Sequence, residues 1–550
     1  MTITRSGICR GLLLTSMLVL AGTVTEARAA TFVVDSVSDD AGLTACTSAP
    51  ADCSLRGALV NANGAGGSNV ITFDAAVFNP GTITLTSTLP TITGTLSIEG
   101  PGASLVTVEG AAGFGLMAAG TGADLTIRGM TFANANAIAS GGALSVTAAT
   151  LTVTRSVFSN NATSGAFGGA VYIESGSVAS FSDTTFSGNA AFGRGGAIYL
   201  TGSSTLALSD CTLTGNHTDT SGASAGLGGA LNIQTSTSAT ITNSTLTGNA
   251  AVFGGGLHLR GSVTVTNSTI AGNTATSGGG GVYNRGVTLE LNNSIISGNA
   301  QSGGSSQCEN VNTGSITNAR NSLIEDNLTC VDGINDNNLT GDPMLGALAD
   351  NGGPTLTMAL HPGSPAIDAG ADALAVDENS APLPIDQRGY TRIIGGAVDM
   401  GAVESGSSPN FIVDTTSDAD LETCSTAPGD CSLRGAIALA NAASQPISIS
   451  FDATEFASAR TITLTASLPT ITNASGVNVR GTGPSLLSID GAGSYRVFAV
   501  GGGADVALEN LTIAHGHANK GGGINSSGTL AVSNVVFDAN VATNTAGGGL

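Results

Sequence analysis

The sequence predicts an all-β fold, a parallel β-helix in which short strands wind into a solenoid. The first observation behind this prediction is a repeated Gly-Gly turn. The second is a bulky apolar residue followed closely by an asparagine. The Gly-Gly copies begin at Gly141, Gly168, Gly195, Gly228, Gly254 and Gly279, and the asparagines are Asn161, Asn189, Asn216, Asn249, Asn273 and Asn299. The Gly-Gly copies are 25 to 33 residues apart, a period typical of a solenoid whose repeats pack on their neighbours.

Two other repeat folds share part of this pattern. Leucine-rich repeats have a similar period but need a regular leucine framework with Asn inside the strand phrase, which this sequence lacks. Propeller blades are about 40 residues or longer. The parallel β-helix therefore fits best.

The segments between the turns alternate apolar and polar residues, as in Leu-Thr-Val-Thr from Leu151 and Val-Thr-Val-Thr from Val263. This alternation predicts strands, and strands this short become stable when coils stack about 4.8 Å apart. Stacking places equivalent inward residues in columns, whose burial is the main stabilising contribution. We expect one column of Phe158, Phe186, Leu213, Leu246, Ile270 and Ile296, and another of Leu144, Val171, Ile198, Leu231, Leu257 and Val282.

Glycine and asparagine recur at the turns for reasons of backbone conformation. Glycine is expected there because a left-handed backbone costs little only for glycine. The recurrent asparagines tolerate the same conformation, and their stacked side chains can hydrogen-bond from coil to coil as a ladder. The Asn-X-Ser/Thr triplets at Asn216 and Asn243 are interpreted as turn chemistry rather than as glycosylation sites.

The chain also repeats on a larger scale. Cys-Ser-Leu-Arg-Gly-Ala occurs at residues 53–58 and again at 431–436, which predicts two tandem units. Residues 55–63 and 433–441 are expected to form a short N-terminal capping helix in each unit. The predicted organisation is a signal peptide at 1–30, a first β-helix unit at 31–341, a distinct domain at 342–404, a linker at 405–409, and a second β-helix unit at 410–550. That last unit stops inside a Gly-Gly-Gly-Leu phrase, so we expect it to be truncated.

The first thirty residues predict export. Arg5 and Arg10 precede an apolar stretch at 11–21 that is too short to span a bilayer, and small residues surround a cleavage point near Ala29. An uncleaved anchor is the alternative interpretation. No later segment is long and apolar enough to form a transmembrane helix. We therefore expect a secreted or surface-attached protein.

Composition narrows the possible partners. The net charge is −22 and the chain has one lysine, Lys520, so nucleic acid is a poor partner. An acidic surface suits solubility and divalent cations. The chain has no tryptophan and only 4% aromatic residues, which counts mildly against a carbohydrate-binding groove lined by aromatic rings.

The cysteines of an exported chain predict disulfides. Metal binding is the alternative, but no histidine lies beside these cysteines in the sequence. Cys211 has no obvious mate. The expected pairs are Cys46 with Cys53, Cys424 with Cys431, and Cys308 with Cys330.

Three kinds of stretch resemble known bacterial families. The Gly-Gly-Ala-Ile phrase at 195–198 and Phe-X-X-Asn at 186–189 resemble polymorphic outer-membrane protein repeats. The Cys-Ser-Leu-Arg-Gly-Ala motif resembles the CSLREA domain, with Gly57 and Gly435 where that motif has Glu. Residues 342–404 resemble a choice-of-anchor Q domain, with Asp-Gln-Arg-Gly from Asp386. These resemblances imply a right-handed β-helix protein, secreted or at the cell surface or outer membrane of a bacterium, with no established enzymatic activity.

Parallel β-helices also include polysaccharide lyases and hydrolases, so catalytic groups need separate consideration. Arginines recur about one or more coils apart without an aspartate cluster of matching period, and they are interpreted as solvated charges: Arg128, Arg155, Arg194, Arg260 and Arg285. Adjacent Asp39 and Asp40, replaced in the second unit by Ser417-Asp-Ala-Asp420, are interpreted as loop polarity rather than as a hydrolase pair. The segment from His515 to Lys520 resembles polygalacturonase motifs only superficially.

Two polar clusters remain as candidate sites. Asp332, Asn335 and Asp336 could hold Ca²⁺ through oxygen ligands, although Asn/Asp-rich loops are often simply turns. The carboxylates of residues 342–404 are expected to form a buried network around Arg388 that holds a loop-rich cap together. They are Asp368, Asp386, Asp399 and Glu404.

The sequence thus favours a non-enzymatic β-helix protein, adhesin-like or structural, with no catalytic residue and no cofactor beyond possible Ca²⁺. Its expected partner is an extracellular surface, a polysaccharide, or a component of a host or neighbouring cell. The alternative is a carbohydrate-active β-helix enzyme, a polysaccharide lyase or hydrolase, or a polysaccharide-binding module.

Overall fold

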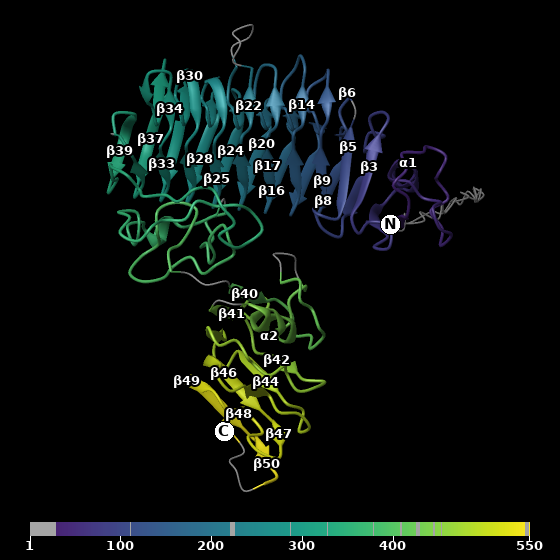
Figure 1. The fold of residues 1–550 in the computed structure, drawn as a ribbon, viewed down its shortest axis with the longest axis vertical. Coiled ribbons are helices and arrows are strands. Elements are labelled where there is room, and N and C mark those ends of the chain that lie inside the picture. The colour runs from purple at the N-terminus through teal and green to yellow at the C-terminus, as the bar shows by residue number, and fades with distance from the viewer. Residues whose placement is uncertain are drawn as a thin grey trace, which may run out of the picture.

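The computed structural model describes residues 29–110, 112–219, 226–286, 288–326, 328–377, 379–406, 410–424, 429–443, 446–452, 454–544 and 549. The predicted signal peptide falls almost entirely outside the described residues, as do residues 407–409 of the predicted linker. The longer part of the molecule is a stack of β-coils, and a smaller β-structure follows it (Figure 1).

Four sheets form the walls of the long solenoid. From β4 (Thr95–Glu99) to β36 (Cys308–Val311) each coil visits the first, second, third and fourth sheet in turn, and the next coil begins again at the first; the coils at both ends use only the first two sheets. The first sheet contains β1 (Thr31–Val34), β2 (Ser68–Phe73), β4 (Thr95–Glu99), β8 (Asp124–Arg128), β12 (Thr150–Thr154), β16 (Val178–Ser182), β20 (Thr205–Ser209), β24 (Ser238–Thr242), β28 (Ser262–Thr266), β32 (Thr288–Asn292), β37 (Ser315–Arg320) and β39 (Val331–Asp336). The second contains β3 (Gly81–Leu85), β5 (Val106–Gly110), β9 (Thr131–Ala133), β13 (Val157–Ser159), β17 (Thr185–Ser187), β21 (Thr212–Thr214), β25 (Thr245–Thr247), β29 (Thr269–Ala271), β33 (Ile295–Ser297) and β38 (Leu323–Ile324).

The other two walls have shorter strands. The third sheet contains β6 (Ala112–Gly113), β10 (Asn136–Ala137), β14 (Ala162–Thr163), β18 (Ala190–Ala191), β22 (His217–Thr218), β26 (Ala250–Phe253), β30 (Thr274–Gly278), β34 (Ala300–Gln301) and β35 (Gly304–Ser305). The fourth contains β7 (Met117–Ala119), β11 (Leu144–Thr147), β15 (Val171–Glu174), β19 (Ile198–Leu200), β23 (Leu231–Ile233), β27 (Leu257–Leu259), β31 (Val282–Arg285) and β36 (Cys308–Val311). The described strand pairs of these sheets are parallel except β34 with β35.

Both predicted apolar columns are confirmed. Phe158 pairs in register with Phe186, and the column continues through Leu213 to Ile296. Leu144 pairs with Val171, and this column continues to Val282. All twelve side chains are at most 1% exposed. The stacked rings of Phe158 and Phe186, 5.0 Å apart, add aromatic contact to aliphatic burial.

The predicted asparagine ladder is also confirmed. The Nδ2 group of Asn189 donates to Oδ1 of Asn216 at 2.9 Å and to the carbonyl of Phe158. The same bonds recur from Asn161 to Asn299, where the carboxamide of Gln307 ends the series. One detail differs from expectation. The left-handed residue is the one before each ladder asparagine, as at Asn160 (φ 54°) and Gly188 (φ 64°), because the ladder asparagine itself turns inward to bond.

Both predicted short helices are present. Helices α1 (Leu55–Ala65) and α2 (Leu433–Ala442) each begin after a serine whose hydroxyl accepts an N–H bond from the third residue on. A Cβ atom at Gly57 would lie 1.9 Å from the carbonyl oxygen of Leu43, so glycine is required where the loop crosses the helix. The described helices include none that could span a membrane.

The loops around the caps correct one sequence interpretation. Asp39 and Asp418 are buried partners of ion pairs rather than polar residues of a solvated loop. Asp39 pairs with Arg56 at 2.9 Å and Asp418 pairs with Arg434 at 2.7 Å, with both carboxylates nearly inaccessible. Each acid also accepts hydrogen bonds from a threonine of a later loop. Each pair therefore fastens the cap helix to the first coils.

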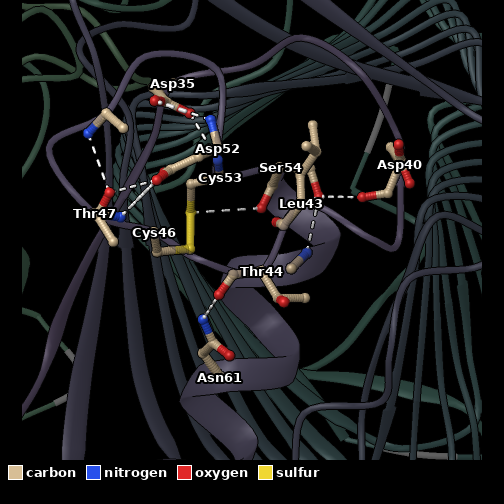
Figure 2. Close-up of a disulfide and its surroundings, with 12 residues drawn as sticks. Asp35, Asp40, Leu43, Thr44, Cys46, Thr47, Asp52, Cys53, Ser54 and Asn61 are labelled. Atoms are coloured by element: carbon tan, nitrogen blue, oxygen red, sulfur yellow. Dashed lines mark hydrogen bonds between the residues drawn. A yellow bond between two sulfur atoms is a disulfide. The ribbon is translucent and has the colours of Figure 1, made fainter.

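The three expected disulfides are confirmed, and Cys211 is a buried free thiol. Figure 2 shows the Cys46–Cys53 bridge beside the start of α1. The carboxylate of Asp35 accepts the backbone N–H of Cys53 at 2.8 Å, so the bridge, the first strand and the cap are joined.

Residues from 410 onward form separate sheets around their own apolar core. The largest has the strand order β40-β41-β43-β46-β44-β42, with β49 on β46. The strands are β40 (Asn410–Val413), β41 (Ile447–Phe451), β42 (Arg460–Thr463), β43 (Val477–Arg480), β44 (Leu487–Asp490), β45 (Phe498–Val500), β46 (Asp505–Ala514), β47 (His517–Ala518), β48 (Ile524–Ser526), β49 (Thr529–Asp538) and β50 (Val541–Ala542). Residues 342–404 form a loop-rich segment with one short helix, η1 (Asp372–Leu374), against the side of the long solenoid.

Candidate functional site

One corner of the solenoid has a distinctive column of side chains. The column lies where the chain turns from the first sheet into the second, and its members share a left-handed backbone with φ between 45° and 55°. Asparagine and aspartate are among the non-glycine residues that accept this conformation most readily. We call it the corner column: Arg155, Asp183, Asp210, Asn243, Asn267, Asn293 and Asn321.

The asparagine half of the corner column holds the segment 342–404. Asn293 donates to the carbonyl of Ala371 at 2.9 Å and accepts the N–H of the same residue at 2.8 Å. Asn243 donates to the carbonyl of Ile385 at 2.9 Å. Asn267 and Asn321 make longer bonds to the same segment. The segment is therefore docked along the corner, coil after coil.

The predicted network around Arg388 is confirmed in part, because its guanidinium pairs with the carboxylate of Asp386 while the other acids hold backbone N–H groups. The guanidinium of Arg388 donates to Oδ2 of Asp386 at 2.9 and 2.6 Å and to the carbonyl of Glu404 at 2.6 Å. The Asp399 carboxylate accepts the N–H of Asp368, and Glu404 accepts the N–H of Asp399. Burial, with a smaller contribution from the charge of Asp399, raises the pKa of Glu404 to about 8. The network fixes the loops of the segment.

Two other residues dock this segment, and neither was predicted from the sequence. Arg392 is wholly buried, and its guanidinium donates to the carbonyl of Gly401 at 3.1 Å and to Oδ1 of Asn243. Gln387 donates to Thr212 and Thr355 at 2.9 Å and accepts from Thr245 at 2.6 Å. Neither residue belongs to a periodic pattern, so periodicity could not reveal them.

The charged half of the corner column opens onto a hollow of about 1060 Å³. Arg155, Asp183 and Asp210 line its wall on the solenoid. The docked segment contributes residues including Arg388 and Tyr390. The facing side is formed by the start of the following β-structure, with Asp414, Asp452 and Glu455.

These acids differ in how fully they are engaged. Asp414 accepts backbone N–H bonds from Gly429, Asp430 and Cys431, and Asp452 accepts them from Thr454 and Glu455. Their lone pairs are used in holding turns.

Asp183 and Asp210 keep unused hydrogen-bonding capacity. Asp183 is 8% exposed, and its Oδ2 atom lies 3.7 Å from Nε of Arg155, an ion pair too long to be a hydrogen bond. The buried Oδ2 of Asp183 and Oδ1 of Asp210 accept no hydrogen bond. Such groups are costly to bury without a partner, so these two carboxylates stand out among the acids of the hollow.

Burial is the main influence on the charge of this trio. It raises the pKa of Asp183, while the positive charge of Arg155 acts in the opposite direction. It raises the pKa of Asp210 well above its usual value, and the neighbouring charge of Asp183 adds to the rise. It also lowers the pKa of Arg155. Burial therefore favours the protonated form of both carboxyl groups, most strongly at Asp210, and perturbed carboxyl groups of this kind are candidates for acid–base chemistry.

The sequence contained an overlooked signal for this trio. Aligning the phrases Arg-Ser-Val-Phe, Asp-Thr-Thr-Phe, Asp-Cys-Thr-Leu and Asn-Ser-Thr-Leu places Arg155, Asp183, Asp210 and Asn243 in one position. The interpretation that no aspartates accompany the arginines at coil spacing is therefore wrong for Arg155. The match becomes visible only when the turn positions of successive coils are aligned, because the residue at this position changes from arginine to aspartate to asparagine.

The other candidate residues lie elsewhere. Asp332, in β39, accepts a bond from Asn310, whereas Asn335 accepts one from Asn338. Within the described ranges, no group of three or more acidic, histidine or cysteine side chains is placed to hold a metal ion. The Ca²⁺ site therefore stays a prediction. His515 contacts Asp490 at 3.0 Å on the smaller β-structure.

Comparison with known proteins identifies the fold. Residues 114–274 match the family model of a right handed beta helix region. The chain thus contains a right-handed β-helix. Among curated proteins no sequence matches it.

Two solved structures similar to this β-helix are polysaccharide lyases. The pectate lyase Pel9A shares 14% identity over 69% of this chain and 97% of its own, with a TM-score of 0.40. The PL6 family alginate lyase AlyGC shares 10% identity over 86% of this chain and 74% of its own, with a TM-score of 0.22. Both are enzymes, and this finding contradicts our prediction that the β-helix protein is not an enzyme. That prediction is withdrawn.

Proposed function

We propose that this β-helix protein is a carbohydrate-active enzyme that cleaves a glycan in the hollow beside Asp183 and Asp210. The observation that carries the proposal is the placement of two incompletely bonded carboxylates, buried Asp183 and half-buried Asp210, at the same position of consecutive coils, on the wall of a hollow of about 1060 Å³. A hollow of this size accommodates a segment of several sugar units.

Hydrolysis is the reaction that this pair supports best. Glycoside hydrolysis generally uses two carboxyl groups, one to protonate the leaving oxygen and one to assist as a nucleophile or base. The two groups must differ in proton affinity, and environment sets that difference. Here Arg155 lies beside Asp183, while Asp210 is buried next to the charge of Asp183. The surroundings thus distinguish the two acids.

The charges around the hollow favour a neutral glycan. Five acidic residues line it against two arginines, and the whole chain carries a net charge of −22. An acidic polysaccharide would be repelled at long range. A neutral chain avoids this repulsion.

Lyase chemistry is the second candidate. Arg155 and Arg388 both line the hollow, and a guanidinium can hold the carboxylate of a uronic acid. In that case cleavage would proceed by elimination and leave an unsaturated sugar.

A panel of neutral and acidic polysaccharides tests both candidates on the full chain. Hydrolysis releases reducing ends without ultraviolet absorbance of an unsaturated product, whereas a lyase produces both. The decisive controls are Asp183→Asn and Asp210→Asn, because asparagine occupies the same corner in the following coils and preserves the turn. Absence of cleavage across the panel, or full activity in both variants, would refute the proposal.

The wider setting of the protein is also proposed. The charged n-region and apolar stretch at residues 1–30 support export to the outside of a bacterial cell or to its surface. The recurrence of the cap helix, its disulfide and its Arg–Asp pair supports two tandem units, divided near residues 405–409. A polysaccharide at that location is the partner that suits the proposed activity.

A further inference from the structure

We infer that glycan cleavage retains the configuration of the sugar, with Asp183 as nucleophile and Asp210 as proton donor. This assignment rests on the proposed function and adds a specific reaction course to it. Both residues line the hollow, and each would touch the reacting sugar.

Spacing is the first argument. Asp183 and Asp210 occupy the same corner in consecutive coils, because Thr185 pairs with Thr212 and Ser182 pairs with Ser209 on either side of them. Paired strands lie about 4.8 Å apart, so equivalent side chains in neighbouring coils have a similar separation. Retaining glycosidases place their two carboxyl groups about 5–5.5 Å apart, whereas inverting enzymes need about 6.5–9.5 Å to admit a water molecule. A one-coil separation belongs to the first class.

The surroundings assign the roles. Arg155 precedes Asp183 in the column and lies 3.7 Å from its Oδ2 atom, which stabilises an anionic nucleophile. Asp210 is one coil further from that guanidinium, and Asn243, the next member of the column, is neutral. Its pKa is raised well above the usual value by burial and by the charge of Asp183. The charge of buried Arg392 and the Asn243 side chain lower the pKa of Asp210, but burial has the larger effect. Asp210 therefore holds the proton that the leaving group needs.

Glycan cleavage then takes two displacement steps. A carboxylate oxygen of Asp183 bonds to the anomeric carbon while the glycosidic C–O bond breaks, and the proton of Asp210 passes to the departing oxygen. Water then attacks the anomeric carbon, Asp210 takes its proton, and the bond to Asp183 breaks. One water is consumed, one hydroxyl appears on each fragment, and two inversions restore the original configuration.

Product configuration and a covalent trap test the assignment. Proton NMR during hydrolysis should show the anomer of the substrate as the first product. A 2-deoxy-2-fluoroglycosyl fluoride of the sugar that is hydrolysed should inactivate the enzyme, and peptide mass spectrometry should place the added sugar on Asp183.

Variants separate the two roles. Asp183→Asn should lower turnover of every substrate at least about 100-fold. Asp210→Asn should lower turnover of the natural glycan similarly, yet spare the first step with an aryl glycoside whose leaving group needs no proton, so a burst of phenol is expected. Asp124→Asn, at an exposed position on β8, should retain full activity.

The outcomes are distinguishable. Hydrolysis with inverted product, or the label on another residue, would overturn the assignment while leaving the proposed hydrolase in place. An unsaturated product would replace hydrolysis by elimination and overturn the assignment too. No cleavage of any glycan would remove both the assignment and the function on which it rests.

Discussion

The guanidinium Nε of Arg155 lies 3.7 Å from Oδ2 of Asp183, one coil away in the same corner column. Both groups line the hollow, and neither of these two atoms makes a hydrogen bond. The two opposite charges therefore lie close together, while these two atoms make no hydrogen bonds to other groups. The ionisation of Asp183 therefore depends on the positive charge of Arg155.

Arg155→Gln should move the pH profile of glycan cleavage. The positive charge of Arg155 lowers the pKa of Asp183 against the effect of burial, so its removal raises that pKa further. The acid limb of kcat/KM should shift to higher pH, because Asp183 must be ionised to react. Arg260→Gln, outside the hollow, is the control. An unshifted limb in Arg155→Gln would show that the two groups do not interact during the reaction.

Glu404 should make the protein less stable as pH rises. Its pKa is about 8 in the folded protein, against 4.5 for an unperturbed glutamate side chain. The folded state therefore binds more protons than the unfolded state between these two pH values. The free energy of unfolding should fall with pH across this window, by at most about 1.4 kcal/mol per pH unit from this group. Denaturant titrations of the native chain and of Glu404→Gln between pH 5 and 8 measure the slope. Equal slopes would contradict the prediction.

Asn216→Ala should break the asparagine ladder at its centre. Asn189 would lose the acceptor of both its backbone N–H and its Nδ2 group, and the carbonyl of Phe186 would lose its donor. Each buried group left without a partner costs about 1–3 kcal/mol, so a loss of several kcal/mol is expected in urea unfolding. The control Asn160→Gly changes a left-handed, exposed position and should stay within about 0.5 kcal/mol. Similar urea unfolding midpoints for the two variants would contradict a stabilising role of the asparagine ladder.

Arg392→Met should loosen the segment 342–404 from the solenoid. The side chain is wholly buried and bridges Gly401 to Asn243. Its removal leaves these neutral oxygens without their donor, a loss of about 1–3 kcal/mol for each of them. Limited proteolysis should cut the segment first, and hydrogen exchange should accelerate around Asn243. Arg285→Met, an exposed arginine, should behave like the native chain; equal protection in both variants would contradict the bridging role.

The periodic features of this protein were predictable from sequence because they repeat. Phe158 and Phe186, or Asn189 and Asn216, occupy equivalent positions, and a one-coil register follows from the period alone. Local features were also accessible, such as the Cys46–Cys53 bridge and the helix after Ser54. Arg392 and Gln387 were not, since their partners lie about 140 to 175 residues earlier in the chain.

The candidate site shows the same division. Asp183 and Asp210 could have been aligned with Asn243 from their flanking residues, but alignment does not reveal which turns are covered. The docked segment bonds the side chains of the column at Asn243 and Asn293 and the backbone carbonyl of Asp210, while the side chains of Arg155, Asp183 and Asp210 line the hollow. The expectation that the β-helix protein is not an enzyme rested on family resemblance and on the absence of an aspartate cluster matching the arginines, and neither of these takes account of this hollow.

The sequence by itself determined the solenoid, its inward columns, its glycine corners and its cap helices, because each depends on contacts between neighbouring repeats. Only the tertiary structure decided where the segment 342–404 docks and which charged corner stays open. The reason is physical: hydrogen bonds such as that between Asn243 and Ile385 join parts of the chain with no common period, and their geometry exists only after the coils have stacked.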